Sequence, residues 1–216
     1  MKKLLLSALV SVAFAAPTIS FAESNNNLTA ISGGTSTAAA RLDFSVVVPG
    51  VLFLRVGTGG LVGAANDTTV DPLVFTVPAT NLGDSTVIAG TGGDVGAGAV
   101  TVRVYSNVGT NVTLNSNVSG QLINGSGDTI PWTQIAVVPA ALAATTTGYT
   151  NGAITHPTFS ATAGNGTATT LTAASKLVRQ EGKWTFSYSN AAVVPAGTYG
   201  STIAKNGRVT YTATQL

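Results

Sequence analysis

The feature that most constrains this chain is a strict alternation of apolar and polar residues in short segments. Trp184, Phe186 and Tyr188, for example, alternate with threonine and serine. Because successive side chains of a strand point to opposite faces, this period predicts half-buried β-strands. The same pattern recurs in five further segments, which are residues 42–48, 73–77, 100–105, 111–115 and 209–213.

Turn signals separate these segments. The chain has 25 glycines, and Asn-Gly pairs begin at positions 124, 151, 165 and 206. The last pair lies between Ile203 and Val209, which predicts a hairpin there. The apolar run of residues 51–54 predicts a strand that lies either at the centre of the sandwich or beneath a partner. The best helix candidate, residues 139–144, is too short to form alone. The pattern therefore predicts an all-β, antiparallel β-sandwich.

The first 22 residues have the composition of a cleaved export signal. Lys2 and Lys3 precede an apolar run at residues 4–16, and small residues at positions 20 and 22 predict cleavage between Ala22 and Glu23. Thirteen apolar residues are too few for a bilayer span, which needs ~20. We therefore expect an exported protein in the periplasm, at the cell surface or outside the cell, without stable membrane insertion after cleavage.

Three parts of the chain are expected: a signal peptide at residues 1–22, a flexible polar extension at 23–40, and a single sandwich domain at 41–216. Removing 22 of the 216 residues leaves 194, enough for one domain with its own core. There is no cysteine, so no disulfide framework stabilises it.

The charge balance gives no support to nucleic-acid binding. The chain has 10 Lys plus Arg and 8 Asp plus Glu, a net charge of +2. Lys2 and Lys3 leave with the signal, so the remaining chain has eight charges of each sign and is neutral. A basic surface for nucleic acid is therefore not expected.

Residues for catalysis or metal binding are scarce. His156 is the only histidine, and no Gly-x-Ser-x-Gly elbow accompanies it, so a surface histidine is favoured over a triad. Glu181 is assigned to a turn within Gln-Glu-Gly-Lys. One histidine without cysteine excludes an ordinary zinc site. Residues 90–96 resemble one unit of a calcium repeat, but such repeats bind as stacks, so a glycine-rich loop is favoured. No enzyme activity, cofactor or metal is expected.

The aromatic residues allow two interpretations. Trp132, Trp184 and Tyr188 are candidates for a platform on which sugar rings stack. Trp184, Phe186 and Tyr188 share one strand face, however, which favours the core. Trp132 remains the candidate ligand platform of an alternative function, a monomeric secreted module that binds carbohydrate or a host molecule.

The C-terminal region resembles a known group of secreted domains. The stretch Val194-Pro-Ala-Gly-Thr-Tyr199-Gly-Ser-Thr-Ile203, followed by Val209-Thr-Tyr211-Thr-Ala-Thr, is similar to the last strands of pilin-like domains of the spore-coat-U and chaperone–usher kind. About 25 residues carry the resemblance. The chain departs from it by lacking a cysteine pair and by inserting residues 204–208, which are expected to split the terminal strand into a hairpin.

The resemblance implies an immunoglobulin-like, pilin-like sandwich that a neighbour's N-terminal strand completes by strand addition. The expected donor is residues 25–37, with Leu28, Ala30 and Ile31 as anchors. Alternatively, residues 41–48 complete the domain within their own chain. The implied partners are other copies or related subunits and a periplasmic chaperone. The expected function is that of a non-enzymatic structural or adhesive protein, such as a fimbrial subunit.

Overall fold

The computed structural model describes residues 24–26 and 37–216, and it divides the chain into two units, residues 1–48 and 49–216. All strands of the described chain lie in the second unit. The expected signal peptide and its cleavage site at Ala22 and Glu23 lie outside the described residues, as do Leu28, Ala30 and Ile31. Within the described part, no helix is long and apolar enough to cross a membrane.

The larger sheet is built around the longest strand, β13 (Val178–Tyr188). On one side β13 pairs with β5 (Ala99–Ser106) along most of its length. On the same side, its last two residues pair with β3 (Ile88–Ala89). On the other side it pairs with β9 (Ile135–Ala140) and, in parallel, with β10 (Thr150–Asn151). β1 (Leu52–Val56) pairs with the outer side of β5, which makes β1 an edge strand.

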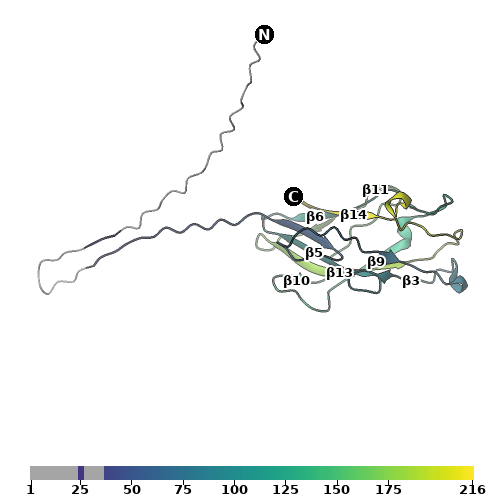
Figure 1. Cartoon of the computed structure of the whole chain (residues 1–216), viewed down its shortest axis with the longest axis horizontal. Helices are drawn as coiled ribbons and strands as arrows, with labels where there is room; N and C mark the ends of the chain where they lie inside the picture. The colour runs from purple at the N-terminus through teal and green to yellow at the C-terminus, as the bar shows by residue number, and fades with distance from the viewer. Residues whose placement is uncertain (1–23, 27–36) are drawn as a thin grey trace, which may run out of the picture. The chain divides into compact units, whose positions relative to one another are not determined.

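The second sheet is centred on β6 (Val112–Val118). β14 (Val209–Gln215) pairs along the whole of β6 on one side. The short strands β11 (Gly164–Asn165) and β12 (Thr169–Leu171) pair with its other side. The two sheets lie in separate layers, with β6 and β14 above β5 and β13 in Figure 1. The fold is therefore an all-β, predominantly antiparallel sandwich, as predicted.

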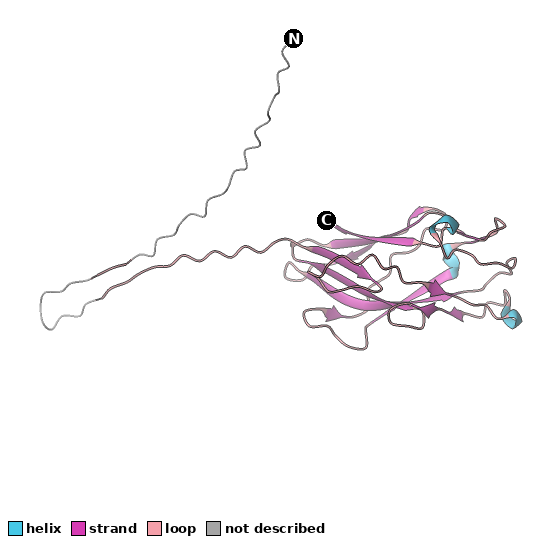
Figure 2. Ribbon diagram, in the orientation of Figure 1, coloured by secondary structure: helices cyan, strands magenta, loops and turns pink. Residues whose placement is uncertain are grey.

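The loops carry only short regular elements. Two small ribbons are formed by β2 (Leu73–Val74) with β4 (Thr91–Gly92) and by β7 (Leu122–Ile123) with β8 (Thr129–Ile130). The helical segments of residues 37–216 are 3-10 turns, η1 (Ala79–Asn81), η2 (Trp132–Gln134) and η3 (Ile203–Lys205). Figure 2 shows them gathered at one end of the sandwich.

The core lies between the two sheets, where the alternating side chains meet. Val102 and Val104 of β5 are fully buried, and Leu114 of β6 is 1% exposed. Trp184 of β13 is also fully buried, and its indole N–H donates to the carbonyl of Ile154. Burial of each such side chain contributes roughly 1.5–3 kcal/mol. The prediction that Trp184 and its strand neighbours form core is confirmed.

Two local predictions are wrong. Residues 41–48 do not form a strand. Ile203 does not begin a hairpin: it starts η3, and Asn206 ends that turn with a left-handed φ of 56°. The reason for the second difference is that β14 pairs with β6, far away in sequence, rather than with a local strand. The Asn124-Gly125 pair does connect two antiparallel strands, β7 and β8.

Candidate functional site

The segment of residues 42–48 has an exposed apolar face. Leu42, Phe44, Val46 and Val48 alternate along it and are 67–88% exposed. Asp43 and Ser45 fall on the opposite side of the alternation. An extended segment with one apolar side and no strand partner is suited to pair with the edge of a sheet.

The edge strands β1 and β14 are the places where a further strand could add. In the described chain, β1 pairs only with β5 and β14 only with β6, so each has a free backbone edge. The two edges are neighbours across the sandwich. Their inward apolar side chains are only partly covered, and Leu52 at the start of β1 is 39% exposed. This side of the core is therefore less completely closed than its centre.

Trp132 is not available as a ligand platform. It lies in η2, is 6% exposed, and packs against Phe159 with ring centroids 5.0 Å apart. Its indole N–H donates to the carbonyl oxygen of Gly120 at 2.7 Å. Because the ring is buried and its N–H is used internally, the expectation of a Trp132 platform is corrected: Trp132 belongs to the core.

His156 is not a surface residue, in contrast to the sequence-based expectation. Its ring contacts Trp184, Phe159 and Phe186, and its Nε2 lies 2.8 Å from the hydroxyl of Tyr211. Burial lowers the pKa of His156 to about 4 and raises the pKa of Tyr211. Both groups are therefore neutral at pH 7. The hydrogen bond links an irregular segment to β14, and among the described residues no serine or carboxylate side chain joins it as a triad would require.

Glu181 is not in a turn but inside β13, where it is fully buried. The guanidinium of Arg103 on β5 donates to the Glu181 carboxylate at 2.8 Å and also donates to the hydroxyl of Thr146. The backbone N–H of Thr146 donates to the same carboxylate. Burial opposes ionisation of Glu181, but the bonds from Arg103 and Thr146 outweigh it and lower its pKa. The Arg103–Glu181 pair therefore holds the loop around Thr146 against the sheet. Sequence reasoning missed it because a 78-residue separation leaves no local signal.

In the glycine-rich loop of residues 90–98, the carboxylate of Asp94 is used in contacts within the fold. The carboxylate of Asp94 accepts from the backbone N–H of Thr101 at 2.7 Å and pairs with Arg55 at 2.9 Å. Gly98 has a φ of +72°, and a Cβ there would collide with the backbone of Gly90. Among residues 24–26 and 37–216, no three acidic or histidine side chains form a possible metal cluster.

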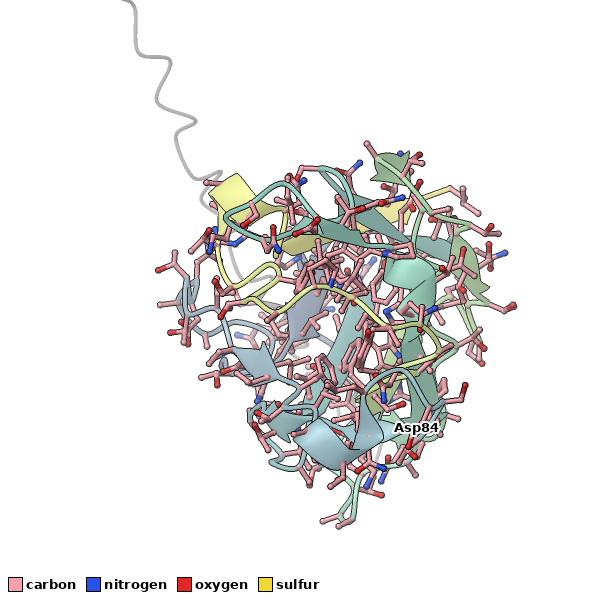
Figure 3. All side chains as sticks on the ribbon, turned by 90° about the vertical axis from the view of Figure 1, so that its right-hand side faces the viewer. Asp84 is labelled. Carbon is pink, nitrogen blue, oxygen red and sulfur yellow. The ribbon has the colours of Figure 1, made fainter. Side chains whose placement is uncertain are left out.

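The loop end of the sandwich is tied by a polar network around Asp84 (Figure 3). Asp84 accepts from the side chain of Asn81 and from the backbone N–H of Thr86, and these bonds lower its pKa. The buried amide of Asn190 donates to Asp84 and to the carbonyl of Asn81. These hydrogen bonds connect the loop of residues 81–86 to Asn190, so the cluster has a structural role.

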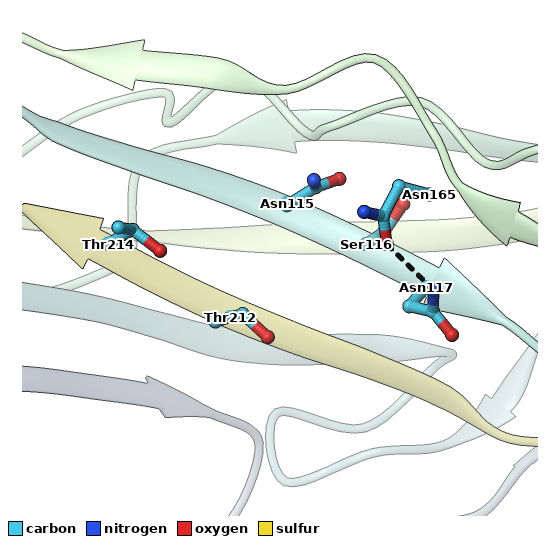
Figure 4. Close-up of a pocket in the computed structure, with 6 residues that line it drawn as sticks. All are labelled: Asn115, Ser116, Asn117, Asn165, Thr212 and Thr214. Atoms are coloured by element: carbon cyan, nitrogen blue, oxygen red, sulfur yellow. Dashed lines mark hydrogen bonds between the residues drawn. The ribbon is translucent and has the colours of Figure 1, made fainter.

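A hollow of about 200 Å³ lies on the outer face of the second sheet (Figure 4). Six uncharged polar residues line it: Asn115, Ser116, Asn117, Asn165, Thr212 and Thr214. They come from β6, β11 and β14. Sequence analysis read Asn115 and Thr212 only as the polar side of strands, since nothing local shows that three strands bring these residues together.

Comparison of the chain with protein-family models, curated proteins and solved structures gave no match. The class that the fold defines is thus an all-β sandwich, and the pilin-like resemblance stays an expectation.

Proposed function

We propose that the protein is a non-enzymatic structural subunit that acts outside the cytoplasm, and that its copies join by strand addition. The observation that carries this proposal is the exposed alternating segment of residues 42–48. Long apolar side chains in water are costly, and Phe44 alone is 88% exposed. An edge in another copy would cover them.

The complementary surface is the pair of edges formed by β1 and β14. β14 has seven residues, and the alternating segment also covers seven positions, from 42 to 48. Paired along β14, the segment would direct Leu42, Phe44, Val46 and Val48 toward the partly covered side chains of the two edges. Main-chain bonds would give affinity, and the apolar contacts would fix the register.

This donor differs from the one expected at residues 25–37. Leu28, Ala30 and Ile31 lie outside the described residues and carry no part of the argument. The alternative that residues 41–48 complete their own domain is not adopted here, because they form no strand in the structure. A periplasmic chaperone would have the role of covering the same edges before assembly, since free edges promote uncontrolled pairing.

Two neighbouring valines provide a matched test. Val46 lies on the apolar face of the segment and Val47 on the other, and both are more than four-fifths exposed. The chain without residues 1–22 should form oligomers over a concentration series in light scattering, with filaments in negative stain. Val46→Asp should weaken association at least ~10-fold, because the carboxylate would be buried, whereas Val47→Asp should stay within about twofold.

Circular dichroism should show that both variants keep the fold. A chain that stays monomeric throughout the series would contradict the proposal, as would equal effects of Val46→Asp and Val47→Asp.

A further inference from the structure

The hollow on the outer face of the second sheet is lined by asparagine, serine and threonine residues, none of which is charged. Along β6 the buried residues alternate with Asn115 and Asn117, which point away from the core. Thr212 of β14 lies opposite Asn115, and Thr214 lies opposite Thr113, the next outward-facing residue of β6. Asn165 of β11 closes the other side, and its amide oxygen accepts from Asn117 at 2.7 Å (Figure 4).

One group in this hollow lacks a partner. The amide oxygen Oδ1 of Asn115 is buried from solvent but accepts no hydrogen bond in the structure. It points toward the side of the hollow where Asn165 lies (Figure 4). Buried amide oxygens without a donor are rare because they lose hydration with no compensation. Because this oxygen is buried, a ligand hydroxyl in the hollow would donate to it once the Asn115 side chain turns Oδ1 toward the opening.

We infer that the hollow is a binding site for a neutral sugar unit of a glycan. Amides both donate and accept, and threonine hydroxyls do the same, which matches the alternating donors and acceptors of a sugar ring. The six lining residues include no charged side chain, so an acidic sugar or a phosphate has no counter-charge there. They include no large apolar side chain either, so a lipid has no complementary surface.

The size of the hollow limits the ligand. About 200 Å³ is below the ~300 Å³ at which pockets for drug-sized molecules begin, so the hollow takes one ring rather than an oligosaccharide. Binding without an aromatic platform depends on hydrogen bonds that compete with water. The affinity for one unit is therefore weak, with a dissociation constant of ~1 mM, and repeated subunits would raise it through multivalency.

The inference is independent of strand addition. Thr212 and Thr214 lie on the outer face of β14, whereas Tyr211 and Ala213 face the core side on which a donor would pack. The hollow is therefore accessible in a single copy. Sugar binding by the monomer can succeed or fail whatever the outcome of the assembly experiment.

The test is an NMR titration of the ¹⁵N-labelled chain without residues 1–22. The probes are methyl glucoside, methyl galactoside, methyl mannoside and N-acetylglucosamine, with glucuronate and inorganic phosphate as charged controls. At least one neutral probe should produce saturable shifts of the side-chain amides of Asn115, Asn117 and Asn165. The charged probes should produce none at these positions.

Thr212→Val removes one lining hydroxyl but keeps the shape and strand preference of the side chain. It should weaken binding ~5-fold, the effect of one lost hydrogen bond. Thr170→Val is the matched control, because Thr170 is exposed on the same face, in β12, but does not line the hollow. Two outcomes would overturn the inference: no saturable shift with any neutral sugar, or equal weakening by Thr212→Val and Thr170→Val. An unchanged backbone spectrum verifies that each variant is folded.

Discussion

Residues 42–48 and β14 carry the same alternating pattern but occupy opposite environments. In β14, Val209, Tyr211 and Ala213 pack against the core, while the threonines between them face solvent. In the earlier segment, Leu42, Phe44, Val46 and Val48 also share one face, with Val47 as the one apolar residue on the other, yet every residue is exposed. Alternation therefore specifies which side chains could be buried together, whereas a paired neighbour such as β6 decides whether they are.

The difference has a physical basis in what each segment can pair with inside its own chain. β14 forms a seven-residue register with β6, which satisfies its backbone and buries one face. Residues 42–48 form no such register among the described residues. This is why the strand prediction succeeded for residues 209–213 and failed for 41–48, and why the exposed segment became the proposed donor.

The largest expected effect comes from truncating one aromatic ring in each region. Tyr211→Ala should lower the free energy of unfolding by about 4 kcal/mol, because it removes the ring that packs on Trp184 and leaves His156 without its partner. Phe44→Ala should change it by less than about 0.5 kcal/mol, since Phe44 is exposed. Urea denaturation of dilute monomer measures both.

Tyr211→Phe separates the ring from its hydroxyl and should cost only about 1 kcal/mol. If Phe44→Ala proved as damaging as Tyr211→Ala, residues 42–48 would be part of the folded core and the comparison would fail.

A smaller effect is expected at the charged pair that joins β5 to β13. Arg103→Met should destabilise the fold by about 3 kcal/mol, because it leaves the Glu181 carboxylate buried without its counter-charge. The double variant Arg103→Met/Glu181→Met should recover most of that loss. Thermal and urea unfolding of the three chains would show this. Additive losses in the double variant would mean that the two side chains are not coupled in this way.

The smallest effect is a pH dependence arising at His156. Burial holds its folded-state pKa at about 4, below the ordinary value of 6.5, so the unfolded chain binds this proton more readily. The stabilisation is complete above pH 6.5, decreases as the pH falls toward 4, and decreases no further below that. We expect a loss of about 2 kcal/mol, discounted for partial exposure of the ring.

The measurement is urea unfolding at several values between pH 4 and 7, with His156→Gln as the control that removes this titration. A difference between the two chains that does not vary with pH would contradict the assignment.

Much of the fold could be read from local pattern. The segments around residues 100–105, 111–115 and 184–189 were recognised as strands because a period of two is a local property. Trp184 was assigned to the core on the same basis. The positions of Glu181 and His156 were misjudged, because a glutamate within the polar sequence Gln-Glu-Gly-Lys and a single histidine are usually exposed. Their burial depends on Arg103 and Tyr211, which are distant in sequence.

The candidate sites follow the same division. The apolar face of residues 42–48 was visible as a pattern, but its exposure was not. The hollow beside Asn115 could not be predicted, because it requires the register of β14 and β11 on β6. At Trp132 the sequence suggested an exposed ligand platform, whereas the structure buries this side chain.

The sequence by itself determined that this chain forms strands and turns, and it determined which side chains share a strand face, because both follow from spacing along the backbone. The tertiary structure decided which faces are covered, which charges are paired and where neutral polar groups converge. Those outcomes depend on contacts between residues far apart in the chain. The alternating residues 42–48 and 209–215 differ for that reason alone: β6 covers one backbone edge of β14, and no strand of the described chain does the same for residues 42–48.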